Sequence, residues 1–386
     1  MKVEQIYSLM NTVTGEVLGK ADIVKEDLSN VVDVGTEIFN QTSVDNYVKS
    51  LVNHIGKVIF VNRPYAGNAP SVLMDGWEFG SVLEKIQADI PEAVENESWN
   101  LVDKQEYKQD IFYKPSVSAK FFNKRVTFEV AMSFTDRQVK ESFSSAEQLN
   151  GFLSMLYNSV EKSMSIKIDS LIMRTINNMI AETIKSDYAG SLTDLTQKSG
   201  VKAVNLLYLY NHKYTKTLTA EQAITDPDFI RFASYTISLY KDRLSKISTL
   251  FNVGGKERFT AGEYLHTILL SDFVSASDVF LQSNTFNKEM IALPKAERVP
   301  YWQGSGTDYS FAKTSDINVT CASGEDIAVS GVIGVMFDRD SLGVSNLNRR
   351  VTTNYNAKAE FYNNYYKFDA GYFNDLNEIF VVFFMK

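Results

Sequence analysis

The chain has 386 residues and is acidic, with 39 lysine and arginine residues against 47 aspartate and glutamate residues and a formal net charge of −8. This charge excludes a global attraction for nucleic acid and leaves room only for local basic patches, because neutralising a phosphate backbone requires a basic surface. Cys321 is the single cysteine, which excludes an intramolecular disulfide and fits a reducing place of synthesis. The sequence shows no signal-peptide pattern and no run of eighteen apolar residues, so we expect no membrane contact.

The N-terminal residues 1–34 alternate polar and apolar positions without a strong helical period. Gly15 and Gly19 interrupt this segment, so we expect an adaptable arm. The residues that follow predict a short amphipathic helix over 43–54 and a strand over 57–62.

Residues 63–123 contain four of the chain's seven prolines, which is typical of an irregular excursion and not of a core. Inside this segment the run 110–113 predicts a strand, and the alternating run 126–134 then returns the chain to a sheet. A loop of this length inside a compact domain is uncommon unless it is functional or packs on something else. We expect that partner to be a neighbouring subunit.

The longest helical pattern covers residues 144–185, a stretch without proline that predicts a helix about 60 Å long. Its apolar residues recur at intervals of three, four and one, as they do on one face of a helix. They are Leu149, Phe152, Leu153, Leu156, Val160, Met164, Ile168, Leu171, Ile172, Ile176, Met179, Ile180 and Ile184. Ser144 and Glu147 predict a capping box. Such a helix is too long for one compact core and predicts a spine for separate parts of the molecule; two shorter helices with a break near 163–165 are the alternative.

The remaining residues predict further helices and strands. In chain order these are a strand over 203–210, a helix over 226–251, a strand over 264–270, a helix from Ser271 and Asp272 through 281, loops over 291–320, a strand over 327–337, a hairpin over 350–367 that turns at Asn356 and Ala357, and a strand over 378–385. The last strand is so apolar that we expect it to be buried on both faces.

No enzyme motif is present in the sequence. Gly254, Gly255 and Lys256 lack the rest of a phosphate-binding loop, and no dinucleotide-binding glycine pattern occurs. His54, His212 and His266 are far apart and have no metal-ligand spacing. Cys321 and His266 could meet in space, but the residues around Cys321 favour a small buried thiol. We therefore predict no catalytic, metal or cofactor site. The basic pairs Lys124–Arg125 and Arg349–Arg350 could contact phosphates or neighbouring acidic loops.

The order of these parts resembles the major capsid proteins of tailed phages, which have the Hong Kong 97 fold, and is most similar to the small podophage (picovirus) group. Four patches carry the resemblance: VGTEIFNQTSVDNYVKSLVNHIGKVIF (34–60), GWEFGSVLEKIQADIPEA (76–93), MLYNSVEKSMSIKIDSLIMRTINNMI (155–180) and FDRDSLGVSNLNRRVTTNYNAKAEFYNNYY (337–366). The resemblance in the order of the elements covers almost the whole chain, whereas the resemblance in amino-acid sequence is limited to these four patches.

The resemblance implies an α+β capsid fold with a definite division of the chain. It implies an N-terminal arm over 1–56, an extended β-hairpin loop over 57–125, a peripheral domain over 126–185 with the spine helix 144–185, an axial domain over 186–345 and closing strands over 346–386. The arm before Val34 is too short for the internal scaffolding region that some relatives carry, so we expect a separate scaffolding protein.

The function that the resemblance implies is self-assembly into an icosahedral or prolate shell that encloses phage double-stranded DNA. The expected partners are the chain itself in pentamers and hexamers, a scaffolding protein, a portal protein and DNA on the inner face, with assembly in the host cytoplasm. Expected inter-subunit contacts are Trp77, Phe79, Trp99, Lys124, Arg125, Arg349 and Arg350. An encapsulin-type compartment shell is the alternative with the same fold, and an α/β enzyme with long insertions is the alternative from another class.

Overall fold

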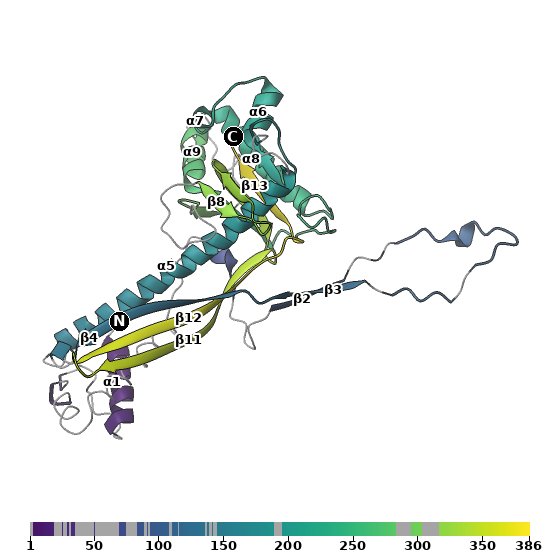
Figure 1. Cartoon of the computed structure of the whole chain (residues 1–386). Coiled ribbons are helices and arrows are strands. Elements are labelled where there is room, and N and C mark those ends of the chain that lie inside the picture. The colour runs from purple at the N-terminus through teal and green to yellow at the C-terminus, as the bar shows by residue number, and fades with distance from the viewer. Residues whose placement is uncertain are drawn as a thin grey trace.

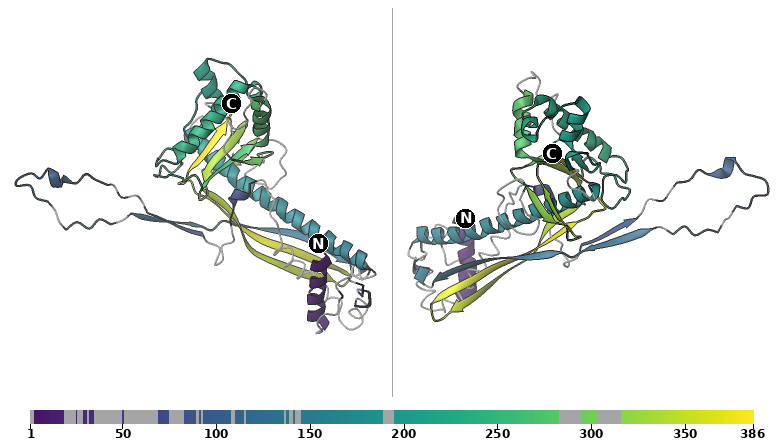
Figure 2. Two further views of the ribbon diagram at one scale, coloured as in Figure 1. Left: turned by 180° about the vertical axis from the view of Figure 1, so that it is seen from behind. Right: turned by 45° about the horizontal axis from the view of Figure 1, so that its top comes forward.

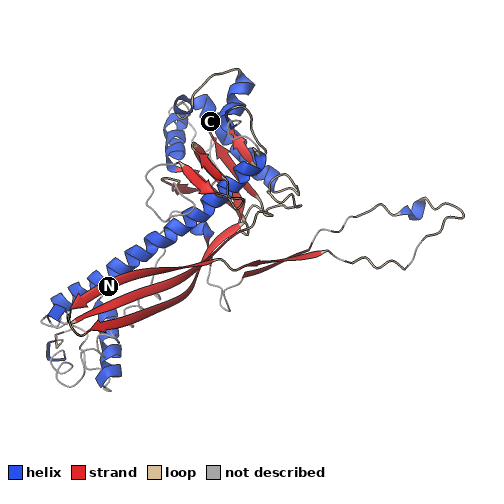
Figure 3. Ribbon diagram, viewed as in Figure 1, coloured by secondary structure: helices blue, strands red, loops and turns tan. Residues whose placement is uncertain are grey.

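A computed structural model of the chain describes residues 3–18, 25, 29–30, 32–34, 50, 69–74, 83–88, 91, 93–107, 110–114, 116–135, 137–138, 141, 145–188, 195–282, 295–302 and 316–386. The molecule is elongated, and one long helix joins two regions that each contain a sheet, while a thin hairpin projects away from both (Figure 1). Figure 3 shows the same arrangement by secondary structure, with helices gathered around the smaller region.

The helices of the described residues are α1 (Val3–Leu18), α5 (Ala146–Asp187), α6 (Leu206–Tyr214), α7 (Ala220–Ala223), α8 (Pro227–Leu244) and α9 (Ser271–Gln282), with 3₁₀ turns η1 (Pro70–Val72) and η2 (Glu97–Trp99). The strands are β1 (Leu73–Met74), β2 (Leu83–Ala88), β3 (Val117–Phe122), β4 (Arg125–Thr135), β5 (Ala203–Asn205), β6 (Leu265–Leu270), β7 (Glu297–Val299), β8 (Ile317–Thr320), β9 (Asp326–Val329), β10 (Val332–Asp338), β11 (Leu342–Asn356), β12 (Phe361–Asn374) and β13 (Phe380–Phe384).

Helix α5 is unbroken over its 42 residues, so the prediction of one long helix is confirmed and the break near 163–165 is wrong. The N-cap is Ser145, whose hydroxyl accepts a hydrogen bond from the Gln148 amide at 3.2 Å. The predicted cap at Ser144 is therefore one residue too early, and Ser144 itself lies outside the described residues. Apolar side chains at three- and four-residue intervals, from Leu149 to Ile184, are fully buried along the helix.

The first sheet has the strand order β1-β11-β12-β4 and packs one face on α5. The long antiparallel hairpin β11–β12 confirms the predicted turn at Asn356, and β4 confirms the predicted strand over 126–134. Aromatic side chains on the helix-facing side bind the layers together: Phe134 contacts Phe152 of α5 edge-to-face, with ring centroids 5.7 Å apart.

The second sheet has the strand order β5-β13-β10-β6-β7. Val382 and Phe384 of β13 belong to the core that contains α5, whereas Val381 and Phe383 belong to the core that contains α8. The predicted burial of this strand on both faces is confirmed. Because β13 pairs in parallel with β5, the end of the chain closes a sheet that begins some 180 residues earlier.

Six sequence predictions are wrong in whole or in part. The helix expected over 226–251 ends at Leu244, and the region expected as loops over 291–320 contains strands β7 and β8. The N-terminal segment contains helix α1, whose Met10, Val13 and Thr14 are buried. Residues 203–210 form the short strand β5 and the start of α6, because Asn205 caps α6 by accepting from the Tyr208 amide at 3.0 Å. The run 327–337 is divided between β9 and β10, and 110–113 forms no strand.

The break in the run 327–337 has a definite cause at Gly331. This residue has φ of +74°, and a Cβ there would lie 2.3 Å from the Met385 carbonyl oxygen. Only glycine fits this close approach, so the chain turns there. The predicted helix over 43–54 and strand over 57–62 lie outside the described residues, apart from residue 50, which is helical.

We predict that truncating the buried stripe of α5 destabilises the protein strongly. Met164→Ala removes a side chain with no exposed surface and should reduce the free energy of unfolding by about 2–5 kcal/mol. The matched control is Met155→Ala on the same helix, where the side chain is 55% exposed and the expected change is within about 0.5 kcal/mol. Denaturant unfolding of the unassembled protein measures both, and equal losses would contradict the assignment of the faces of α5.

Candidate functional site

The antiparallel hairpin β2–β3 projects far from both sheets and ends in an extended segment (Figure 2). We call the described residues among 91–114 the hairpin tip. The strands are in register from Leu83 opposite Phe122 to Ala88 opposite Val117. Opposed residues share a face, so Leu83, Lys85 and their partners face one side, and Glu84, Ile86 and their partners face the other.

The hairpin tip carries large apolar side chains in contact with solvent. Trp99 is 93% exposed, Phe112 is 87% exposed and Tyr113 is 81% exposed. Val94, Leu101, Val102, Tyr107 and Ile111 are exposed as well. Scattered exposed apolar residues are ordinary, but a concentration of this kind marks an interaction surface.

Polar contacts within the tip are local. The Ser98 amide donates to the Asn96 side-chain oxygen at 2.8 Å, and the Val102 amide donates to the Tyr107 hydroxyl at 2.9 Å. Lys104 has φ of +67°, which sharpens the turn between these residues. These contacts shape the tip without covering its aromatic rings, so burial of the rings requires another molecule.

The exposed surface continues along one face of the hairpin strands. Ile86, Val117 and Phe121 lie on the face that contains Glu84, and each is more than half exposed. Our sequence reasoning missed these three residues and also Phe112 and Tyr113. The period-two alternation of LEKIQA and VSAKFF was a usable signal for the strands, but alternation alone does not say which face stays exposed.

Of the predicted contact residues, Trp99 lies at the hairpin tip, while Trp77 and Phe79 lie outside the described residues. The predicted basic residues lie away from the tip. Lys124 and Arg125 lie where the hairpin joins β4, and Arg349 and Arg350 lie on β11. Lys124 is exposed in the turn before β4, and its carbonyl oxygen accepts from the Tyr372 amide at 3.1 Å. The structure therefore does not bring Trp99 together with the basic pairs.

Arg125 and Arg350 are brought together around one carboxylate, Asp369 of β12. Arg350 Nη1 donates to Asp369 Oδ2 at 2.7 Å, and Thr127 Oγ1 donates to Asp369 Oδ1 at 2.5 Å. Burial raises the pKa of Asp369, but these hydrogen bonds and the charges of Arg350 and Arg125 outweigh it, so the pKa lies below its ordinary value. Arg349 pairs with buried Phe368 and faces the opposite side of the sheet, so the pair Arg349–Arg350 is split between two faces.

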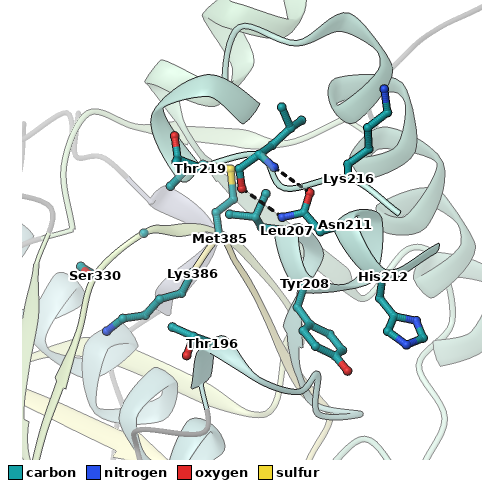
Figure 4. A pocket seen from close by; sticks show the side chains of 13 residues that line it. Thr196, Leu207, Tyr208, Asn211, His212, Lys216, Thr219, Ser330, Met385 and Lys386 are labelled. Atoms are coloured by element: carbon teal, nitrogen blue, oxygen red, sulfur yellow. Dashed lines mark hydrogen bonds between the residues drawn. The ribbon is translucent and has the colours of Figure 1, made fainter. Parts of the chain in front are cut away.

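A cavity of about 670 Å³ lies near the end of β13, between α6 and the turn before β10 (Figure 4). The Asn211 side chain bridges its rim, donating to the Leu218 carbonyl at 3.0 Å and accepting from the Leu218 amide at 3.1 Å. His212 stacks on Tyr208, and the side chains of His212, Lys216 and Lys386 point away from one another. This lining does not form a nucleophile–base arrangement.

The described residues contain neither a metal-binding cluster nor a membrane-spanning helix. No group of three or more histidine, cysteine, aspartate or glutamate side chains there could hold a metal ion. Among the helices of the same residues, none is long and apolar enough to cross a membrane. The exposed hairpin is therefore the feature with the clearest functional geometry.

The fold is similar to that of solved phage capsid proteins. A chain in the capsid structure of Staphylococcus phage Andhra matches with a TM-score of 0.51 and 10% sequence identity, over 84% of this chain and 86% of that chain. At this identity the likeness defines the fold alone. The expected α+β capsid fold of the Hong Kong 97 type is confirmed.

The sequence comparisons define the family. The family model of Phi29-like phage major capsid proteins matches residues 10–384, and the chain belongs to this family. The chain is also 22% identical over 217 residues to the major capsid protein of Bacillus phage B103, which covers 53% of this chain and 47% of that protein. The match therefore spans about half the length of this curated relative. The family is one of structural capsid proteins, so the non-enzyme prediction is confirmed and the enzyme and encapsulin alternatives are not favoured.

We predict a pH-dependent contribution of Asp369 to stability. Because its folded pKa is lowered, this contribution is present above the unfolded pKa of about 3.9 and is lost as the pH falls through the folded pKa. The stability difference between the wild type and Asp369→Asn should be largest near neutral pH and should shrink below about pH 4. Denaturant unfolding at a series of pH values measures it, and a difference that grows on acidification would contradict the prediction.

Proposed function

We propose that this chain is the major capsid subunit that assembles with copies of itself into an icosahedral or prolate shell enclosing phage double-stranded DNA. The observation that carries the proposal is the hairpin tip, with Trp99, Phe112 and Tyr113 exposed at the end of a hairpin that leaves its own subunit. An apolar surface presented in this way is stabilised when a second copy covers it.

The hairpin favours a head-to-tail contact between copies. The tip and the surface that receives it are different parts of the chain, so the interface is heterologous, and repetition of such a contact generates rings when the rotation closes. Pentamers and hexamers are the rings that a closed shell uses in this proposal. Exposed aromatic side chains suit anchors in partner pockets, because tryptophan and tyrosine contribute most to interface energies.

The remaining inter-subunit contacts of the proposal are Trp77, Phe79, Lys124, Arg125, Arg349 and Arg350, together with Trp99. Arg350 is partly engaged by Asp369 within its own subunit, so Lys124 and Arg125, both exposed at the start of β4, are the stronger candidates for reaching a neighbour.

The proposal keeps the division of the chain that the resemblance implies. The parts are an arm over 1–56, an extended loop over 57–125, a peripheral domain over 126–185, an axial domain over 186–345 and closing strands over 346–386.

The proposal places the protein in the virion, with assembly in the host cytoplasm beside a separate scaffolding protein and a portal protein. The net charge of −8 suits an inner wall that does not grip DNA tightly during packaging. Electron microscopy of the purified chain, alone and with a co-expressed scaffolding protein, tests the proposal. Only small monodisperse particles under all assembly conditions would contradict it.

We predict that Trp99→Ala and Phe112→Ala impair assembly and leave the fold intact. Both side chains contact mainly solvent in the subunit, so each change should alter the free energy of unfolding by less than about 0.5 kcal/mol. Shell yield, measured by sedimentation and electron microscopy, should fall at least several-fold.

Two control variants fix the interpretation of that experiment. Tyr235→Ala removes an aromatic ring that is 61% exposed on α8, far from the tip, and should leave shell yield unchanged. Trp302→Ala removes a ring with no exposed surface, whose Nε1 donates to the Val332 carbonyl at 2.8 Å, and should destabilise the subunit by about 3–5 kcal/mol. Normal shell yield from both tip variants would show that the tip rings do not serve assembly.

A further inference from the structure

The two strands of the hairpin place like charges directly opposite each other. Lys85 of β2 and Lys120 of β3 are register partners, and both lie on the face that contains Leu83 and Phe122. Like charges directly opposite on adjacent strands are destabilising. This arrangement requires a counter-ion, and the body of the subunit supplies one at this position.

That counter-ion is Asp375, in the turn between β12 and β13. Lys120 Nζ lies 2.7 Å from Asp375 Oδ1, and Lys85 Nζ lies 3.2 Å from Asp375 Oδ2, so each lysine has its own carboxylate oxygen. The Asp375 side chain has no exposed surface. Burial raises the pKa of Asp375, but the hydrogen bond from Lys120 and the neighbouring positive charges outweigh it, and the pKa is lowered.

A second carboxylate connects the group to Arg258, in the loop before β6. Lys85 Nζ also lies 2.8 Å from Glu378 Oε1, and Arg258 Nε lies 3.3 Å from the same oxygen. We call Lys85, Lys120, Arg258, Asp375 and Glu378 the root cluster. It joins three segments that are distant in sequence: the hairpin, the turn after β12 and the loop before β6.

Backbone hydrogen bonds order the turn that carries Asp375 and Glu378. The Asp375 amide donates to the Ser341 carbonyl at 2.7 Å, and the Glu378 amide donates to the Asp375 carbonyl at 3.2 Å. The Asn377 amide donates to Asp375 Oδ1 at 3.0 Å. Because these bonds fix the carboxylates relative to both sheets, the two lysines are held at a fixed place on the body.

The hairpin has few other fixed points among the described residues. Its strands pair with each other, and an isolated two-stranded hairpin is only marginally stable. Apart from the root cluster, Lys85 Nζ donates to the Asp340 carbonyl at 3.2 Å, and the ring of Phe122 contacts Phe373 of β12, with centroids 5.1 Å apart. The opposite face, with Ile86 and Phe121, is exposed to solvent.

We propose that the root cluster positions the hairpin: Asp375 and Glu378, by binding Lys85 and Lys120, fix the direction in which β2 and β3 leave the subunit. The inference that this direction matters for assembly rests on the proposed function. Without the carboxylates, the opposed lysines repel each other, and the body-facing side of the hairpin keeps only the contact of Lys85 with the Asp340 carbonyl and the ring contact of Phe122 with Phe373. The hairpin then samples a range of directions while both sheets stay folded.

The test measures the hairpin's direction in the unassembled protein. Spin labels on Ser118→Cys in β3 and Tyr235→Cys in α8, both exposed positions, report one distance in a Cys321→Ala background. Asp375→Asn should broaden the distance distribution at least twofold relative to the wild type. The matched control, Glu129→Gln, removes the partner of Lys367 at 3.1 Å on the first sheet and should leave the distribution unchanged.

A second variant provides the test if Asp375→Asn does not fold. Lys85→Met with Lys120→Met removes the cations from the hairpin, outside the turn that Asp375 organises, and should broaden the distribution as well. An unchanged distribution in this double variant, with a cooperative thermal transition showing an intact body, overturns the inference. Equal broadening in Glu129→Gln also overturns it.

The two proposals fail separately in these experiments. A wild type that forms no shells under any condition, while the root-cluster variants still broaden the distance distribution, contradicts the proposed function and leaves the positioning role standing. Shells from the wild type together with unchanged distances in the variants contradict the positioning role alone. If the Lys85→Met and Lys120→Met double variant forms shells of altered size or shape, this result supports both the proposed function and the positioning role of the root cluster.

Discussion

The continuous burial of one helix determines how the rest of the chain is arranged. Helix α5 is about 60 Å long, which exceeds the diameter of a small domain. The apolar stripe on one face of the helix is nevertheless buried from Leu149 to Ile184. No single sheet can cover that length, so the helix packs against β4, β11 and β12 of the first sheet, against β5 and β13 of the second sheet, and against the β8–β9 hairpin. The two-region architecture follows from the length of the buried stripe.

The closing strands complete this arrangement because they pair with segments from much earlier in the chain. β12 pairs with β4, and β13 pairs with β5. Each sheet is therefore completed only after residues 361–384 are in place. Asp375 lies in the turn between these two strands, at the junction of the two regions. A charge held at this junction has a fixed position relative to both sheets, which is why the hairpin root can be aligned on it.

Periodicity predicted the elements whose burial has a simple geometry. The stripe of α5 follows from the spacing of its apolar residues, and the burial of β13 on both faces follows from its continuous apolar run. The sequence predictions are wrong where a single local contact determines where an element begins or ends. Ser145 caps α5 in place of Ser144, and Gly331 divides an apolar run because it lies against Met385. Residues 110–113 have strand-like composition but no neighbouring strand in the described structure, so composition misled us there.

The candidate site was only partly predictable for the same physical reason. Trp99 was expected at an inter-subunit contact because the resemblance assigns the proline-rich excursion to an extended loop laid over a neighbour. The pairing of Lys85 with Lys120 depends on the register of β2 and β3, and their shared carboxylate is 290 and 255 residues away in sequence. Buried charge pairs have small net effects on stability, since desolvation offsets the attraction, whereas their geometry is specific. In the two proposals made above, the root cluster sets the direction of the hairpin and the exposed rings of the tip supply affinity for a partner, so two different kinds of interaction act in one hairpin.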